Sequence, residues 1–345
     1  MGLKRTSKLP IIRESFLQKK KKLKPNHKFT DTTKINSRQT TNNNNTDPSV
    51  RDIVLHSYPS DALPNRPHKV LLPNQLVTTL ASEGARRSKE SIGNLLQSSI
   101  FAGSFVALGG MLCSSIGGDY YTNDSRDSSF WLPGNGQARF LFGAIGFPLS
   151  ILLVTLTGSF AFTGNLALAG AAISTKKIKW YNTIPMLVTT YIGCFFGTSF
   201  GGLFVALAKI PSLHPCYRIT LHKLSLSPLQ VFLRGIGGGY LIAMAITLGA
   251  GTLKGGGGLS DIAFAIWFPI STYVMLDFEH CLANMFFFSA AFFYSRDLGV
   301  DYQLRIRDLV CSLFFSTAGN VVGSMGLAGF LLSKSMNKNV VSKKN

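Results

Sequence analysis

Two stretches of the sequence are apolar over more residues than one membrane-spanning helix needs, and each is interrupted near its middle. Residues 140–173 contain the interruption Gly158–Asn165, and residues 262–294 contain Asp277–Asn284. The hydrocarbon core of a bilayer is about 30 Å thick, which about 20 helical residues span. We therefore predict that each stretch forms two half-helices joined by non-helical backbone.

Four further apolar stretches, at residues 92–116, 184–208, 228–253 and 309–333, are each long enough for one span. With them, the interrupted stretches occupy equivalent positions in two halves of three spans. Paired interruptions are typical of an inverted repeat, and non-helical backbone at membrane depth persists only where it is buried or lines a watery cavity. The sequence predicts an all-α membrane protein of six spans, with a transport path between two inverted three-helix repeats.

The charge distribution excludes a soluble nucleic-acid-binding protein. Lys and Arg number 35 against 16 Asp and Glu, but only 15% of residues are charged. Most of the positive excess precedes residue 91, and residues 91–118 contain no charged side chain. Runs such as Lys19–Lys22 and Asn42–Asn45 cannot form a core, so we predict a disordered basic arm at 1–70, a membrane domain at 71–333 and a basic tail at 334–345.

Lysines in short loops predict the orientation. Lys176, Lys177 and Lys179 follow the second span, and Lys254 follows the fourth. By the positive-inside rule these loops and both termini are cytosolic. The N-terminal segment, which is basic and poor in acidic residues, also resembles an organelle transit sequence. We expect an integral protein of the plasma membrane rather than of a plastid envelope.

The five cysteines form no CxxC pair and are odd in number, which argues against a disulfide framework or a zinc site. We expect each to pack as a small buried hydrophobe, and we expect no metal and no cofactor.

Ionisable residues in the second interruption are the strongest functional candidates. His280 lies beside Glu279 and Asp277, with Asn284 one turn later. Ionisable groups are costly at membrane depth, so they indicate function by default. We predict that His280 is part of a transport site.

Other polar residues lie near the same depth or at the mouth of the path. Thr163 and Asn165 in the first interruption suit a neighbour of an imidazole, or alternatively a helix cap. The connection 209–227 is basic, although the predicted orientation places it on the non-cytosolic side of the membrane. We expect it to be a loop with Lys223 as an exposed cation. Arg234, about two turns into the fourth span, is expected to snorkel or to pair with an acidic residue.

Two glycine-rich stretches carry no phosphate-loop signature. Neither residues 235–239 nor residues 255–258 follow a strand or precede Lys-Ser/Thr. We interpret the first as a site of close helix packing and the second as a loop.

Four segments resemble motifs of the formate/nitrite transporter family, in the expected order. Residues 278–285 resemble its FEHSxANM signature, and residues 162–165 its LFTGN break. Residues 232–237 resemble FLRGI(G), and residues 318–323 the final GN(I/V)(I/V)G motif. The resemblance covers residues 71 to 333.

The resemblance implies an aquaporin-like bundle that assembles as a homopentamer, with one anion path in each protomer. It implies that His280 and Thr163 form the central pair, with Asn284 nearby and Lys223 as the cation of the vestibule. The residues implied to line its two apolar constrictions are Phe147, Ile151, Phe162, Tyr273 and Ile242. The implied supporting residues are Glu279, Asn165, Arg234 and Asn320.

Three positions depart from the family pattern. Phe160 stands where the family usually has Asp or Glu, Gly239 where it has Asn, and Tyr273 where it has Phe. The missing acid leaves the choice of substrate open.

We predict transport of a small monovalent weak-acid anion together with a proton, and no enzymatic activity. The partners are the anion, protons, the lipid bilayer and four further copies of the chain, but not nucleic acid. Nitrite is favoured if the arm is a plastid transit sequence, and formate or lactate if it is not; hydrosulfide is also small enough.

Two alternatives belong to other classes. An aquaporin-type pore for neutral solutes needs Asn-Pro-Ala at both interruptions, and neither has it. An intramembrane hydrolase would need His280 beside a nucleophile such as Ser271 or Cys281.

Overall fold

The computed structural model describes residues 71–117, 146–210, 213–297 and 304–341. They all belong to one compact unit, Ser60–Asn345. The predicted disordered arm, residues 1–70, lies outside the described residues, as do the first loop and residues 140–145 of the second predicted span.

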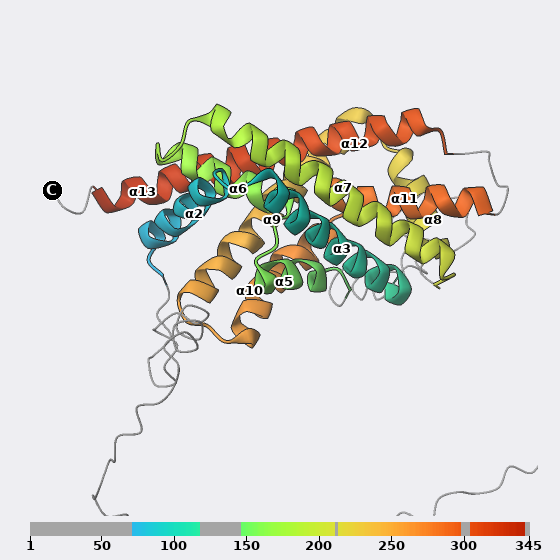
Figure 1. Cartoon of the computed structure of the whole chain (residues 1–345), viewed down its shortest axis with the longest axis horizontal. Helices are drawn as coiled ribbons and strands as arrows, with labels where there is room; N and C mark the ends of the chain where they lie inside the picture. Colours follow the sequence, from blue (N-terminus) through green and yellow to red (C-terminus); the bar gives the residue numbers. More distant parts are fainter. Residues whose placement is uncertain (1–70, 118–145, 211–212, 298–303, 342–345) are drawn as a thin grey trace, which may run out of the picture. The chain divides into compact units, whose positions relative to one another are not determined.

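All regular structure in the described residues is helical (Figure 1). In chain order the elements are α2 (Pro73–Arg87), α3 (Ile92–Gly117), α5 (Pro148–Thr157), α6 (Phe162–Ser174), η3 (Trp180–Thr183), α7 (Ile184–Leu207), α8 (Leu213–Leu224), α9 (Pro228–Lys254), α10 (Leu259–Met275), α11 (Cys281–Asp297), α12 (Ile306–Asn320), the π-helix η4 (Val321–Leu332) and α13 (Ser333–Val341).

Four helical stretches among the described residues are long and apolar enough to cross a membrane: Ile92–Ile116, Trp180–Leu207, Pro228–Lys254 and Ile306–Asn337. The pair α5 and α6 makes a fifth if it counts as one span, bent by 60°. These stretches coincide with apolar regions of the sequence, so the prediction of an all-helical membrane fold is confirmed.

Both predicted interruptions exist, but they are shorter than expected. Gly158, with φ of +68°, ends α5, and α6 begins at Phe162. Asp277, with φ of +56°, lies between the end of α10 and the start of α11 at Cys281. Thr163 is therefore in the first turn of α6, whereas Glu279 and His280 lie in the break before α11.

The expectation that residues 209–227 form a loop is wrong, because most of this connection is helix α8. Its buried residues recur every three or four positions, which is the spacing of one helix face. The buried residues are Leu213, Pro215, Cys216, Ile219, Thr220 and Lys223. The two prolines and two histidines of this segment obscured that pattern.

The glycines of α9 pack closely against neighbouring backbone, as predicted. A Cβ on Gly239 would lie 2.7 Å from Cα of Asn320, and one on Gly235 would lie 3.1 Å from Cα of Gly319. A Cβ on Gly238 would lie 2.2 Å from the carbonyl oxygen of Glu279. Gly238 thus lets α9 contact the break that precedes α11.

Replacing Gly238 with Ala should destabilise the protein by about 1–3 kcal/mol, because the methyl group meets backbone that must shift. Gly326→Ala is the matched control, since its Cβ would meet no atom within 4 Å. Thermal unfolding in detergent should show a lower midpoint for Gly238→Ala alone. Equal midpoints for both variants would contradict the packing argument.

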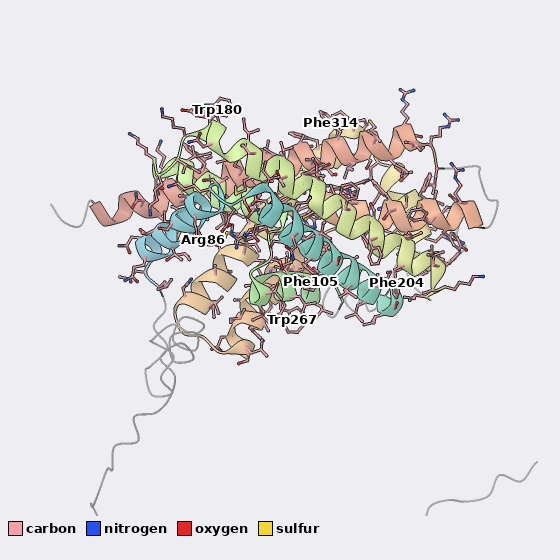
Figure 2. All side chains as sticks on the ribbon, in the orientation of Figure 1. Arg86, Phe105, Trp180, Phe204, Trp267 and Phe314 are labelled. Atoms are coloured by element: carbon pink, nitrogen blue, oxygen red, sulfur yellow. The ribbon has the colours of Figure 1, made fainter. Side chains whose placement is uncertain are left out.

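Large apolar side chains cover the outside of the bundle. Trp180, Phe204 and Phe314, labelled in Figure 2, are each at least half exposed. A water-soluble protein rarely exposes so much contiguous apolar surface, whereas lipid chains or further protomers would cover it.

Four of the five cysteines are buried as predicted, but Cys311 on α12 is exposed.

Candidate transport site

A hydrogen bond joins the two breaks. Thr163, in the first turn of α6, places Oγ1 3.1 Å from Nε2 of His280, which immediately precedes α11. Both side chains are buried. The hydroxyl of Ser324 on η4 donates to the carbonyl of Thr163 at 2.8 Å and fixes the start of α6. The sequence separated these residues by more than 100 positions, and the fold brings them into contact.

Two aromatic rings enclose His280 on one side. The ring of Tyr273 lies edge-on at 5.6 Å from that of Phe147 and 6.0 Å from the imidazole. Together with Lys223 and Asp277 these three residues line a narrow cavity of about 30 Å³. This volume suits about one water molecule or a very small ion.

Lys223 is buried, so the expectation of an exposed vestibule cation is wrong. Its side chain is 8% exposed, and Nζ donates to Oε1 of Glu279 at 2.8 Å. Asn284 donates from Nδ2 to the other oxygen of Glu279 at 2.6 Å. The reason is that helix α8 turns Lys223 toward the bundle instead of leaving it in a solvated loop. Lys223, Glu279 and Asn284 form one charge-assisted chain beside His280.

Asn320 fixes the backbone of the second break. Its Nδ2 donates to the carbonyls of Gly235 and Glu279, at 2.8 and 2.9 Å. Its Oδ1 accepts from the backbone N–H of Cys281 at 2.8 Å. Both ends of one amide therefore satisfy backbone groups that the break leaves without helical partners.

Arg234 was expected either to snorkel or to pair with an acidic residue, and the structure shows the pairing. Its guanidinium donates to the carboxylate of Asp277. Nε2 of His222 lies 3.0 Å from the same carboxylate oxygen. We call His222, Asp277 and Arg234 the Asp277 cluster.

The first break has a second polar contact on the side of α2. Arg87 donates from Nη1 to Oδ1 of Asn165 at 3.0 Å, and its guanidinium lies 4.4 Å from the ring centroid of Phe160. Glu83, rather than an acid at position 160, pairs with Arg87 at 2.8 Å. Hydrogen bonds from Arg86 and Arg87 hold the pKa of Glu83 at about 2, so this carboxylate is ionised at physiological pH.

These α2 residues border a larger cavity. It measures about 240 Å³ and is lined by Glu83, Arg87 and Lys254 among mainly apolar neighbours. The cavity lies against the residues of the first break, including Gly158 and Ala161. In the described residues, a cavity therefore lies beside each of the two breaks.

The residues expected to line the two constrictions are all buried. Phe147 and Tyr273 line the cavity beside His280. The ring of Phe162 packs against Tyr191 of α7 at 4.9 Å. All five residues belong to one hydrophobic core.

The capping interpretation of Thr163 and Asn165 is wrong. Ala161 occupies the N-cap position of α6 and makes no side-chain capping bond. The two polar side chains contact His280 and Arg87 instead.

Sequence reasoning missed the roles of Arg87, Glu83, Ser324 and His222. Glu83 and Arg87 are four residues apart, a spacing that signals a helical ion pair. Ser324 gave no signal, because a lone serine in an apolar helix is common. The contact of His222 with Asp277 depends on the tertiary fold.

The fold and the site together define an integral membrane transport protein: apolar helices surround buried polar residues at two helix breaks. Within that class, the model of the formate/nitrite transporter family matches residues 74–333. The chain belongs to the formate/nitrite transporter family.

Two curated relatives illustrate the similarity. The uncharacterized transporter YrhG of Bacillus subtilis is 27% identical over 277 residues, covering 79% of this chain and 96% of its own length. Formate-nitrite transporter 3 of Toxoplasma gondii is 25% identical, covering 71% of this chain but only 48% of its own length. Because the relatives are transporters and channels, the expectation that the chain is not an enzyme is confirmed.

Solved structures share the fold. An FNT family ion channel superposes with a TM-score of 0.62 at 21% identity, covering 74% of this chain and 96% of the other. A pentameric formate channel with formate bound superposes with a TM-score of 0.56 at 21% identity, covering 70% and 96%. These similarities give no support to a pore for neutral solutes.

Proposed function

We propose that the chain conducts a small monovalent weak-acid anion, nitrite or formate before lactate, through a path that passes His280. The observation that carries the proposal is the contact between Thr163 and His280, which joins the two helix breaks beside a narrow cavity. Membership of the family supports anion transport, and one relative, named as a formate channel, supports formate as a substrate.

The apolar surroundings of the cavity beside His280 favour passage of the neutral acid over passage of the anion. Phe147 and Tyr273 offer the anion little hydration beside His280, and a bare anion in such surroundings is penalised by several kcal/mol or more. Protonation removes that charge. We therefore propose that a proton accompanies the anion.

Unpartnered polar atoms support a site beside His280. Among the described residues, Nδ1 of His280 and Oδ1 of Asn284 are buried without a hydrogen-bond partner. Buried polar atoms are usually paired, with protein groups or with water. In our proposal, water or substrate completes these bonds during transport.

For topology, we propose six spans in two inverted repeats, with the breaks before α6 and before α11 as equivalent features. The membrane domain then extends over residues 71–333, between the basic arm at 1–70 and the basic tail at 334–345. Both termini are cytosolic, and α8 lies outside. The plasma membrane is favoured over a plastid envelope.

We also propose a homopentamer with one path in each protomer. A solved structure with the same fold is described as a pentameric formate channel, and the exposed apolar faces of α7 and α12 would suit contacts between protomers. Light scattering of the protein in detergent tests this assembly.

Uptake into proteoliposomes tests the function. Purified protein should accelerate uptake of labelled formate and nitrite over protein-free vesicles, and an inward proton gradient should increase it. Lactate and hydrosulfide, assayed in parallel, rank the substrates. Glycerol is the neutral control; acceleration of glycerol without any anion would overturn the proposal.

A further inference from the structure

One helical segment contacts both breaks. Helix α12 ends at Asn320 and continues directly into the π-helix η4. The side-chain amide of Asn320 donates to the carbonyl of Glu279 and accepts from the N–H of Cys281, both at the second break. Four residues later, the hydroxyl of Ser324 donates to the carbonyl of Thr163, just after the first break. The start of η4 therefore links the first break to the second.

The backbone of η4 packs directly against two other helices. A Cβ on Gly170 of α6 would lie 2.8 Å from Cα of Gly329 on η4. A Cβ on Gly323 of η4 would lie 2.8 Å from the backbone nitrogen of Tyr240 on α9. Such close packing transmits displacements instead of absorbing them. Ser324 is thus held at a fixed place beside the start of α6.

The hydrogen bond of Ser324 differs from the usual bond of a serine in a helix. A buried helical hydroxyl commonly donates to a carbonyl of its own helix. Ser316 on α12 does so, since it donates to the carbonyl of Leu313 at 3.0 Å. Ser324 donates instead to Thr163, which is 161 positions away in the sequence, at 2.8 Å. Its π-helix is also of a kind that is rare and frequent at functional sites.

We propose that Ser324 is a positioning residue for transport, because it holds the backbone of Thr163 so that the Thr163 hydroxyl meets Nε2 of His280. Ser324 is completely buried and is not among the residues that line the cavity beside His280, so it acts through Thr163. Thr163 in turn limits where the imidazole lies, and the imidazole lines the cavity. This inference rests on the proposed function, because it concerns which anions pass His280.

The expected consequence is selection by size. The cavity beside His280 measures about 30 Å³, and a fixed imidazole keeps it narrow. Formate and nitrite are similar in size, whereas lactate is larger. If the start of α6 is released, the imidazole gains freedom and the larger anion benefits more than the two smaller ones.

Ser324→Ala tests the proposal through ratios of uptake. Vmax/KM for lactate, formate and nitrite is measured with the full chain in proteoliposomes at one pH. The lactate-to-formate ratio should rise by about twofold to tenfold, as expected for the loss of one hydrogen bond. The nitrite-to-formate ratio should stay at the wild-type value. A variant that merely folds less well would lower all three uptakes equally and leave both ratios unchanged.

Two further variants test the route through Thr163. Ser324→Cys keeps the size of the side chain but has a weaker donor, so its lactate-to-formate ratio should be intermediate. Thr163→Val removes the hydroxyl that meets His280. Adding Ser324→Ala to Thr163→Val should change the ratio no further, because the contact that Ser324 supports is already lost. An equal rise in both backgrounds would overturn the inference.

Ser316→Ala is the matched control. Ser316 is also completely buried in the same long helical stretch, but its hydroxyl bonds only within α12. Its lactate-to-formate ratio should equal that of the wild type. An unchanged ratio in Ser324→Ala, or the same rise in Ser316→Ala, would overturn the inference while leaving the transport function intact. Absence of any anion uptake by the wild type would instead refute the proposed function.

Discussion

Replacing His280 with Phe is expected to abolish proton-linked anion uptake, with a loss of at least about tenfold. The substitution keeps an aromatic ring beside Phe147 and Tyr273 but removes the nitrogen that lies 3.1 Å from Thr163. The ring can then neither hydrogen-bond to the anion nor carry a proton. Uptake of formate and nitrite into proteoliposomes, at several pH values, measures the effect.

The control for this variant is His214→Phe, the same exchange at an exposed position of α8. It should transport like the wild type. Both variants should elute at the size of the wild-type assembly, which separates loss of transport from misfolding. Unchanged uptake and unchanged pH dependence in His280→Phe would refute the assignment of the central site.

Glu279→Gln should lower the free energy of unfolding by about 3 kcal/mol, because it leaves the ammonium of Lys223 buried without an opposite charge. Glu279 is completely buried, so water cannot replace the lost charge. Thermal or denaturant unfolding in a mild detergent should show the loss directly.

A double substitution separates the ion pair from other effects. In Lys223→Met/Glu279→Gln no charge remains unpaired, so this variant should be more stable than Glu279→Gln alone. If the two single losses simply add in the double variant, the pair contributes no coupling and the explanation fails.

Periodicity and length predicted most of the fold. The apolar stretches correspond to α3, α7, α9 and the helix from Ile306 onward, because a bilayer requires long apolar helices. The same reasoning overlooked α8 and α2. These helices are short and amphipathic, so their polar residues cancel their apolar residues when hydropathy is averaged along the chain.

The sequence allowed the residues of the candidate site to be predicted, but not the contacts between them. His280 stood out because an imidazole that directly follows two acids is unusual in an apolar stretch. Its contact with Thr163 depends on how the two breaks face each other. The burial of Lys223 could not be read from a linear sequence, because it depends on the direction in which α8 turns its charged residue.

The left-handed backbone of Asp277 has an evolutionary consequence. Only Gly, Asn and Asp adopt this conformation readily, so most substitutions at this position would disturb the break itself. Codons for Asp become codons for Gly or Asn by a single base change, and both exchanges remove the negative charge. Descendants of this chain can therefore remove a charge from the cavity beside His280 by one mutational step and still keep the backbone that positions His280.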